Sequence, residues 1–322
     1  MIKKIILSFG LCVSLYAYNE NTFTINILEG KEFDIHLYSS IKSNTSYGFV
    51  QTKQKQYAFW GSAKNDEYYI DIADFGTCVL KDMHKNKFEA LCKINDIRKE
   101  FDFLASKSNA SIYQLSLKEQ KQLDANKTIE FDFSEDILKI SSQSKNLEKI
   151  IDDFNENLDK DSLKQKVKES FDKWNKEDIA NNEFLSQAYV FYQDKHIISL
   201  GKNTYEYKGG AHGMTNFLRK TYSIDDMKLL RLKNELKIEN EDFQSMVKQK
   251  ILSLYNENEL FDIKELKIGE IFEVRKNGLV LIWEPYDIAP YSTGVIEIFI
   301  SYDELEPFWK NNSKLAYLSK IK

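Results

Sequence analysis

Short runs that alternate between apolar and polar positions dominate residues 18–106. These runs are Phe23–Leu28, Phe33–Tyr38, Tyr47–Gln51, Tyr57–Trp60, Tyr68–Ile72, Phe88–Cys92 and Glu100–Leu104. Clusters of turn-forming residues separate them, for example at residues 43–46. Closely spaced short strands divided by turns are typical of a small antiparallel sheet, sandwich or barrel. We therefore expect an all-β module over residues 18–106, with the aromatic run Tyr57–Trp60 in its core.

The pattern changes to a helical period in residues 107–185. The stretch Ser106–Asn126 is polar and has no clear period, which predicts a linker, and Ile129–Phe133 then alternates like a strand. Apolar side chains next recur at the spacing of one helical face: Leu147, Ile150, Ile151, Phe154 and Leu158, followed by Leu163, Val167, Phe171 and Trp174. Either Asp159 or Asp161 is placed to cap the second of these helices.

The C-terminal part, residues 186–322, mixes strands and helices. Two apolar runs flank the polar residues 193–195, which is typical of a β-hairpin. Further strands are expected at Thr204–Tyr207, Asn216–Ser223, Leu279–Trp283 and Val295–Ile300, and helices at Phe243–Leu254 and, from a capping box, at Ser301–Glu304. The predicted fold class is α+β: a small all-β N-terminal module, then an antiparallel sheet packed with helices.

The N-terminus has the features of a secretory signal peptide. Lys3 and Lys4 precede an apolar segment from Ile5 to Leu15, and Ala17 is a small residue before an expected cleavage site. The apolar segment is too short to span a bilayer comfortably, so an uncleaved anchor is the weaker interpretation. A lipid anchor on Cys12 is also weaker, because bulky Leu11 precedes that cysteine. We expect a periplasmic or secreted protein with no transmembrane anchor after cleavage.

Charge and cysteine content fit an exported protein. Loss of residues 1–17 would change the formal net charge from −5 to −7, and an acidic chain lacks the basic patch of a nucleic-acid binder. Two cysteines, Cys78 and Cys92, would remain. In an oxidising compartment an even pair at hairpin spacing favours a disulfide, with two buried free thiols as the alternative.

Glycine and proline concentrate in two segments of a chain that is otherwise poor in both. The first is Tyr207-Lys208-Gly209-Gly210-Ala211-His212-Gly213, which holds three of the twelve glycines within five positions. The second is Tyr286-Asp287-Ile288-Ala289-Pro290-Tyr291-Ser292-Thr293-Gly294, which holds or adjoins two of the three prolines. Such density indicates a tightly specified backbone.

These two motifs, with a Leu-Leu-x-Leu segment at Asp225–Leu232 and a helix between them, resemble one extracellular domain family. The family includes the lysozyme-sensing ectodomain of the anti-sigma-V factor and the N-terminal region of some peptidoglycan N-acetylglucosamine deacetylases. The resemblance covers about residues 186–310 and extends more weakly to Ile112–Trp174. It implies a cell-envelope domain that associates with peptidoglycan or with enzymes that attack it. The deacetylases carry their catalytic domain after this region and this chain stops at Lys322, so we do not expect their activity to transfer directly.

Candidate catalytic groups are few. The four histidines, His36, His84, His196 and His212, show no i, i+4 pair, and we expect neither a metal nor another cofactor. His212 is the one histidine set in a turned, accessible loop. Either it acts chemically, or it hydrogen-bonds the Tyr286–Gly294 segment and holds the two motifs together, which we favour. The nearby tyrosines suit either a core or a binding surface.

The sequence thus predicts a non-catalytic binding module for peptidoglycan or other glycan fragments or for lysozyme-like hydrolases. Its expected binding residues are Tyr207, Gly209, Gly210, His212, Gly213, Tyr286, Pro290 and Tyr291. An envelope hydrolase or deacetylase that uses His212, and an envelope assembly factor, are the alternatives. Asn126, within the acidic-extended sequence Asp124–Thr128, is a candidate for bacterial N-glycosylation.

Overall fold

The computed structural model describes residues 18–40, 42–52, 55–124, 127–141, 144–173, 181–263 and 266–320. Three features predicted from the sequence lie outside these residues: the signal peptide in residues 1–17, the glycosylation candidate Asn126, and Trp174 of the second helical face.

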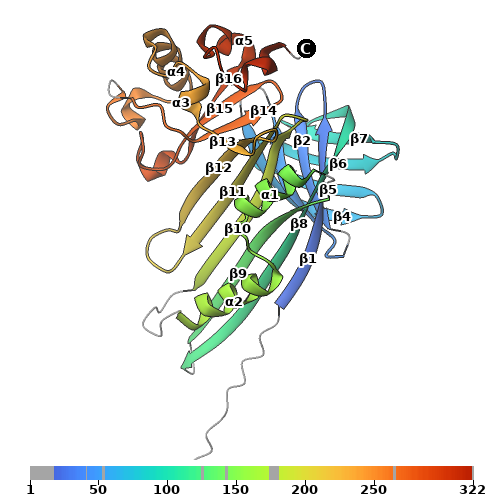
Figure 1. The fold of residues 1–322 in the computed structure, drawn as a ribbon. Coiled ribbons are helices and arrows are strands. Elements are labelled where there is room, and N and C mark those ends of the chain that lie inside the picture. Colours follow the sequence, from blue (N-terminus) through green and yellow to red (C-terminus); the bar gives the residue numbers. More distant parts are fainter. Residues whose placement is uncertain are drawn as a thin grey trace, which may run out of the picture.

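Eight antiparallel strands form a barrel in the N-terminal part (Figure 1). They are β1 (Tyr18–Glu29), β2 (Asp34–Ser40), β3 (Thr45–Gln51), β4 (Gln56–Lys64), β5 (Glu67–Ile72), β6 (Gly76–Asp82), β7 (Lys87–Ile94) and β8 (Ile97–Asp124). Each strand pairs with the next, and β8 pairs again with β1. Alternate side chains such as Ile35, Phe59 and Leu80 fill the interior, and closure leaves no free sheet edge. The all-β module is confirmed, and its architecture is the barrel.

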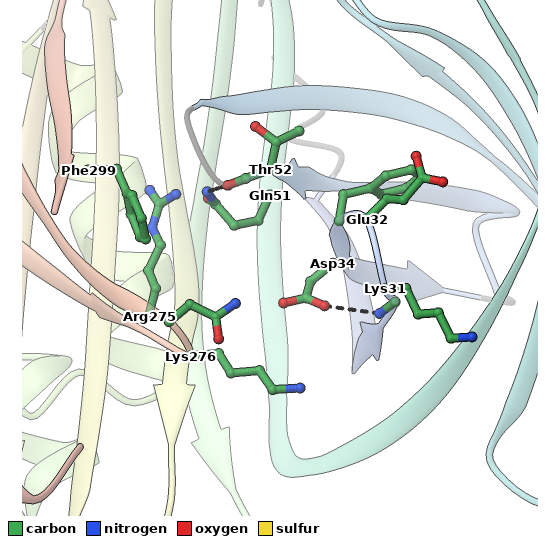
Figure 2. Close-up of a pocket in the computed structure, with 11 residues that line it drawn as sticks. Lys31, Glu32, Asp34, Gln51, Thr52, Arg275, Lys276 and Phe299 are labelled. Atoms are coloured by element: carbon green, nitrogen blue, oxygen red, sulfur yellow. Dashed lines mark hydrogen bonds between the residues drawn. The ribbon is translucent and has the colours of Figure 1, made fainter. Parts of the chain in front are cut away.

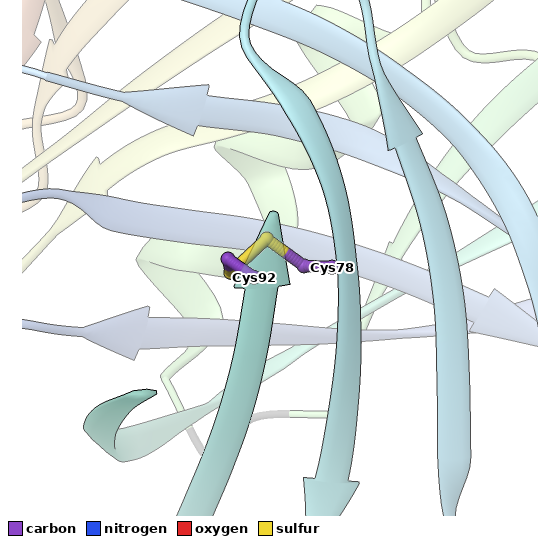
Figure 3. Close-up of a disulfide and its surroundings, with 2 residues drawn as sticks. All are labelled: Cys78 and Cys92. Carbon is purple, nitrogen blue, oxygen red and sulfur yellow. A yellow bond between two sulfur atoms is a disulfide. The ribbon is translucent and has the colours of Figure 1, made fainter. Parts of the chain in front are cut away.

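The barrel interior contains the predicted disulfide (Figure 3). Cys78 on β6 lies directly opposite Cys92 on β7, and both side chains are buried in the barrel core. The bond therefore cross-links two neighbouring strands of the barrel wall.

The predicted linker at Ser106–Asn126 is wrong, because β8 continues as a strand to Asp124. Its second half pairs with β1 on one side and with β9 (Lys127–Ile140) on the other. Up to Leu117 the two neighbours pair with its backbone and bury Ile112, Leu115 and Leu117, and beyond Leu117 β9 continues the pairing, so polar composition did not prevent strand formation. The predicted division of the chain at residue 106 falls inside this strand.

The same sheet continues beyond the barrel through β9, β10 (Asn182–Gln193), β11 (Ile197–Tyr207), β12 (Met214–Ser223) and β13 (Lys228–Leu230). The hairpin predicted around residues 193–195 is confirmed as β10–β11, and the strand expected at Thr204–Tyr207 is the end of β11. Strands β9 and β10 are parallel, and the connection between them holds α1 (Lys145–Phe154) and α2 (Lys160–Lys173). Asp159 caps α2, because its Oδ1 accepts hydrogen bonds from the backbone N–H groups of Asp161 and Ser162.

Aromatic side chains join the barrel to this extended sheet. Tyr38 on β2 and Phe49 on β3 point out of the barrel and contact Tyr189 on β10, at ring-centroid distances of 5.6 and 5.9 Å. Helix α1 buries Leu147, Ile150, Ile151 and Phe154 in the same apolar cluster, as its periodicity predicted.

A separate three-stranded antiparallel sheet forms the C-terminal part, with β14 (Phe272–Arg275), β15 (Gly278–Trp283) and β16 (Ile296–Ser301). It shares one apolar core with α3 (Leu232–Glu235), α4 (Glu241–Leu254) and α5 (Tyr302–Leu305). Phe243, Val247 and Ile251 bury the predicted face of α4, and the capping box at Ser301 starts α5. Short 3₁₀ helices lie at Glu257–Glu259, Tyr291–Thr293, Glu306–Phe308 and Ala316–Lys320.

The molecule is therefore mostly β, with a few helices, rather than evenly α+β. The expectation of helices packed on an antiparallel sheet fits the C-terminal part, where α4 and α5 contact the small sheet. It understated the strand content elsewhere, because residues 106–124 were interpreted as a linker and β6, β13 and β14 were not predicted.

Candidate functional site

The first glycine-rich segment is the loop between β11 and β12, and its glycines have two different roles. Gly209 and Gly210 adopt φ angles of 103° and 91°, which residues that carry a Cβ atom rarely adopt. Gly213 instead permits a close approach: a Cβ atom there would lie 2.4 Å from Cζ of Tyr205. The loop thus requires glycine near its start for its backbone conformation and at its end for lack of space.

The second segment is the loop between β15 and β16. Gly294 has a φ of 79°, and Tyr286 itself adopts a φ of 77°, which is uncommon for a residue with a side chain. The Tyr286 N–H donates to the carbonyl of Ala289, 3.0 Å away, and Ala289 is buried. Pro290 precedes a 3₁₀ turn that begins with Tyr291.

The two segments contact each other, and we refer to residues 207–213 and 286–294 together as the paired loops. The rings of His212 and Tyr291 stack, with centroids 3.8 Å apart and an angle of 16° between planes. The Tyr291 hydroxyl donates a 2.7 Å hydrogen bond to the Gly213 carbonyl. Beside them the N–H of Phe217 donates to Oε1 of Glu284 at 2.7 Å. Residues about eighty positions apart thus form one structural unit.

His212 contributes to this unit by ring stacking rather than by the hydrogen bond we expected across the loops. Its Nδ1 lies 3.1 Å from the carbonyl of its own neighbour Gly213. Within the described residues, this is the one hydrogen-bond contact of the His212 ring, and no carboxylate there lies within hydrogen-bond distance of it. The contacts of the ring are therefore its stacking on Tyr291 and its approach to the Gly213 carbonyl.

The surface of the paired loops is aromatic and accessible. The Tyr286 side chain is 52% exposed, and its ring lies 5.9 Å from that of Tyr291. His212 is exposed as well. Tyr207 is half-buried and donates from its hydroxyl to the Gly210 carbonyl at 3.1 Å, which braces the first loop from within. Tyrosine and histidine rings with polar edges suit contact with a sugar or a protein surface.

A network of buried charges lies between the barrel, β12 and the C-terminal sheet. Glu273 on β14 is fully buried and forms ion pairs with Arg219 on β12, at 2.6 Å, and with Arg275. Burial alone would raise the pKa of the Glu273 carboxyl, but the charges and hydrogen bonds of the two arginines outweigh it and keep this pKa below its usual value. Arg275 also donates to the side chain of Gln56 on β4 at 2.8 Å.

Close to this network, Figure 2 shows a small pocket lined by Asp34, Gln51, Arg275 and Lys276, among others. Its volume of about 50 Å³ fits a few water molecules rather than a larger ligand. Among the described residues, no group of three or more His, Cys, Asp or Glu side chains is arranged to hold a metal ion. None of the helices built from those residues has the length and hydropathy needed to cross a membrane.

Sequence reasoning missed two features. Trp60 was assigned to the core with the rest of its strand, but only Phe59 is buried there, and Trp60 is 60% exposed on the outer barrel face. Strict alternation along β4 was the available signal, since neighbours on a strand face opposite sides. The buried charge network was also missed, although Glu273 and Arg275 alternate with apolar residues in one short run.

Comparison with known families matches two consecutive regions of the chain. Residues 106–215 match the family described as deacetylase PdaC, and residues 228–303 match DUF3298, a family of unknown function. The resemblance expected from the two motifs is confirmed. The first of the paired loops lies in the PdaC region and the second in the DUF3298 region, so their contact joins the two.

Two solved structures of DUF3298 proteins are similar to parts of this chain. One, from Bacteroides fragilis NCTC 9343, is 16% identical, with 66% of this chain and 99% of that chain covered and a TM-score of 0.45. The other, from Pseudomonas aeruginosa PAO1, is 20% identical, with 62% and 94% covered and a TM-score of 0.46. A search of the curated proteins finds no match.

Proposed function

From a chain that carries a PdaC region followed by a DUF3298 region, we infer an envelope protein related to the deacetylase and anti-sigma-V ectodomains, and we propose that its paired loops bind a ligand without catalysis. The proposed ligands are peptidoglycan or other glycan fragments, or a lysozyme-like hydrolase. The disulfide and the PdaC match both support a location outside the cytoplasm. Export by the N-terminal signal is part of the proposal.

The observation that carries the proposal is the exposed aromatic surface built from both loops. Tyr286, Tyr291 and His212 present three neighbouring rings, and the backbone beneath them is fixed by positive-φ glycines and by the Tyr291–Gly213 hydrogen bond. A rigid aromatic surface loses little conformational entropy on binding. This rigid aromatic surface therefore favours binding of a ligand by the paired loops.

Catalysis through His212 is the second candidate function, and the local geometry favours it less. Acid–base chemistry needs an oriented imidazole beside a nucleophile or a second acid. In the described residues the His212 ring contacts Tyr291 and the Gly213 carbonyl instead. Turnover of a peptidoglycan substrate that His212→Ala abolishes, while binding persists, would support the enzyme.

A hydrolase ligand would be favoured by charge. Lysozyme-type ligands of basic character would be attracted by the net charge of −5, although salt screens this attraction over about 8–10 Å. An assembly role would instead appear as a co-purifying protein whose binding is independent of any glycan.

Isothermal titration of the exported, disulfide-bonded protein tests the proposal. The probes are a peptidoglycan disaccharide-peptide and lysozyme, the latter at two salt concentrations. We expect saturable binding of at least one probe, weakened about tenfold or more by Tyr286→Ala, since an exposed central aromatic is a typical hot spot. Leu254→Ala, at a 57% exposed position on α4, is the matched control and should bind normally. Equal affinity of wild type and Tyr286→Ala would remove the paired loops as the site.

A further inference from the structure

The outer face of the barrel carries an open groove of about 650 Å³ that runs across β4 to β8. It lies on a different part of the molecule from the paired loops. Two rows of side chains line it, and each row follows the direct cross-strand register. The structure therefore presents a second candidate binding surface, which is independent of the proposed function.

One row is apolar. Tyr69 on β5 lies opposite Val79 on β6, which lies opposite Leu91 on β7. Tyr69 and Leu91 are 47% and 46% exposed, and on the adjoining strand Trp60 is 60% exposed. Surface apolar residues scattered singly are ordinary, but four within one groove mark an interaction site.

The other row has polar side chains in its middle, an aromatic ring at one end and a guanidinium at the other. From β4 to β8 it reads Trp60, Asp71, Thr77, Lys93 and Arg98, each opposite the next. Five adjacent strands span about 19 Å along the sheet, from strand spacings of about 4.8 Å. An aromatic ring thus stands at one end of an extended row of hydrogen-bonding groups, and a guanidinium stands at the other.

Arg98 lacks a counter-charge of its own. Lys93 pairs with Asp96 at 2.7 Å, whereas no carboxylate among the described residues lies within ion-pair distance of Arg98. In a chain with a net charge of −5, an exposed, unpaired guanidinium inside a groove is complementary to an anionic group. Arginine binds carboxylates bidentately, which would fix the orientation of a ligand.

The disulfide makes the floor of the groove rigid. Cys78 and Cys92 line it from beneath, and they lie between the outward residues Thr77 and Val79 on β6 and between Leu91 and Lys93 on β7. As Figure 3 shows, the bond links these two strands directly. Preorganisation of this kind lowers the entropy lost on binding.

We propose that this groove binds an oligosaccharide that carries a carboxylate. Trp60 and Tyr69 stack on the apolar faces of the sugar rings, the row from Asp71 to Lys93 hydrogen-bonds their hydroxyl edges, and Arg98 pairs with the carboxylate. The alternation of flat apolar rings with donors and acceptors over an extended groove fits a sugar chain better than a compact ligand.

Two probes of equal length test this: a neutral N-acetylglucosamine tetramer, and a peptidoglycan tetrasaccharide that bears carboxylates. We expect the full exported protein to bind both, the acidic probe more tightly. Trp60→Ala should weaken both about tenfold or more. Arg98→Gln should weaken the acidic probe alone, by about tenfold, and so abolish the preference. All positions are exposed, and unchanged melting temperatures will show that each variant folds.

Leu104→Ala, at a 62% exposed position on β8 outside the groove, is the control and should bind both probes as wild type does. Trp60→Ala with wild-type affinity would overturn the site, and Arg98→Gln weakening both probes equally would overturn the carboxylate assignment. Each variant is also titrated in a Tyr286→Ala background, in which the paired loops are weakened, so that a further loss of affinity belongs to the groove and either site can fail without the other.

Discussion

Gly213 shows how a single residue without a side chain positions the candidate site. Its carbonyl accepts the Tyr291 hydroxyl, and its Cα lies so close to the Tyr205 ring that a Cβ atom would clash with several ring atoms. A side chain at position 213 would therefore displace either the Tyr205 ring or the first loop, which reaches Tyr291. Gly210 is different, because space is free around it and only its φ of 91° requires glycine.

We predict that Gly213→Ala destabilises the protein by about 1–3 kcal/mol, because the Tyr205 ring or the loop must move. Gly210→Ala should cost less, about 1–2 kcal/mol, since only backbone strain is added. Urea denaturation of both variants measures the two losses. If Gly213→Ala also moves the loop, it should weaken ligand binding at Tyr286, whereas a neutral Gly213→Ala would contradict the close approach.

At the scale of single elements, β14 connects the parts of the molecule through charge. Its Glu273 lies between Arg219 of the large sheet and Arg275, and Arg275 reaches Gln56 of the barrel. Buried ion pairs contribute little net stability when complete, but breaking one leaves an uncompensated charge in the interior. Strand β14 thus depends on every member of the network.

Glu273→Gln should therefore destabilise the fold by about 3–5 kcal/mol, since two buried guanidinium groups lose their counter-charge. The matched control is Glu270→Gln, which removes only an exposed ion pair with Lys233 and should cost at most about 1 kcal/mol. Denaturant unfolding provides the measurement. Similar losses in the two variants would contradict the dependence of the two arginines on Glu273.

The sequence predicted those elements whose pattern of apolar and polar residues is local, and missed those that depend on distant segments. The alternating runs of the barrel, the helical faces of α1 and α4 and the hairpin β10–β11 follow local rules, and the structure contains them. The second half of β8 does not follow such a local rule, because its stability comes from pairing with β1, which is distant in sequence, and with β9. The glycine motifs likewise predicted that two loops belong together, but the stacking of His212 on Tyr291 arises only in three dimensions.

At the scale of the whole molecule, two buried titratable groups act on stability in opposite directions. Burial, with the nearby Arg275 charge, lowers the pKa of His36 from 6.5 to about 3. Burial raises the pKa of Asp136 from 3.8 to about 6, although hydrogen bonds from Gln114, Ala188 and Tyr47 oppose the shift. Both groups lie where the barrel meets the extended sheet, since His36 also contacts the Val190 carbonyl on β10.

The signs follow from proton uptake. Between about pH 6.5 and 3 the unfolded chain binds a proton at His36 that the folded protein does not, so stability falls as pH falls. Between about pH 6 and 4 the folded protein holds a proton on Asp136 that the unfolded chain releases, so stability rises as pH falls. In the wild type the two contributions offset each other over this window.

Replacing one of these two groups should reveal the pH dependence of stability that the other contributes. Relative to wild type, Asp136→Asn should lose stability as pH falls from 6 to 4, by up to about 1.4 kcal/mol per pH unit, because the His36 contribution is no longer opposed. His36→Gln should change in the opposite direction over the same range. Urea denaturation at pH 4, 5, 6 and 7 gives both curves, and differences from wild type cancel the background of surface carboxylates. Variant curves parallel to wild type would mean that these two groups do not titrate as their burial implies.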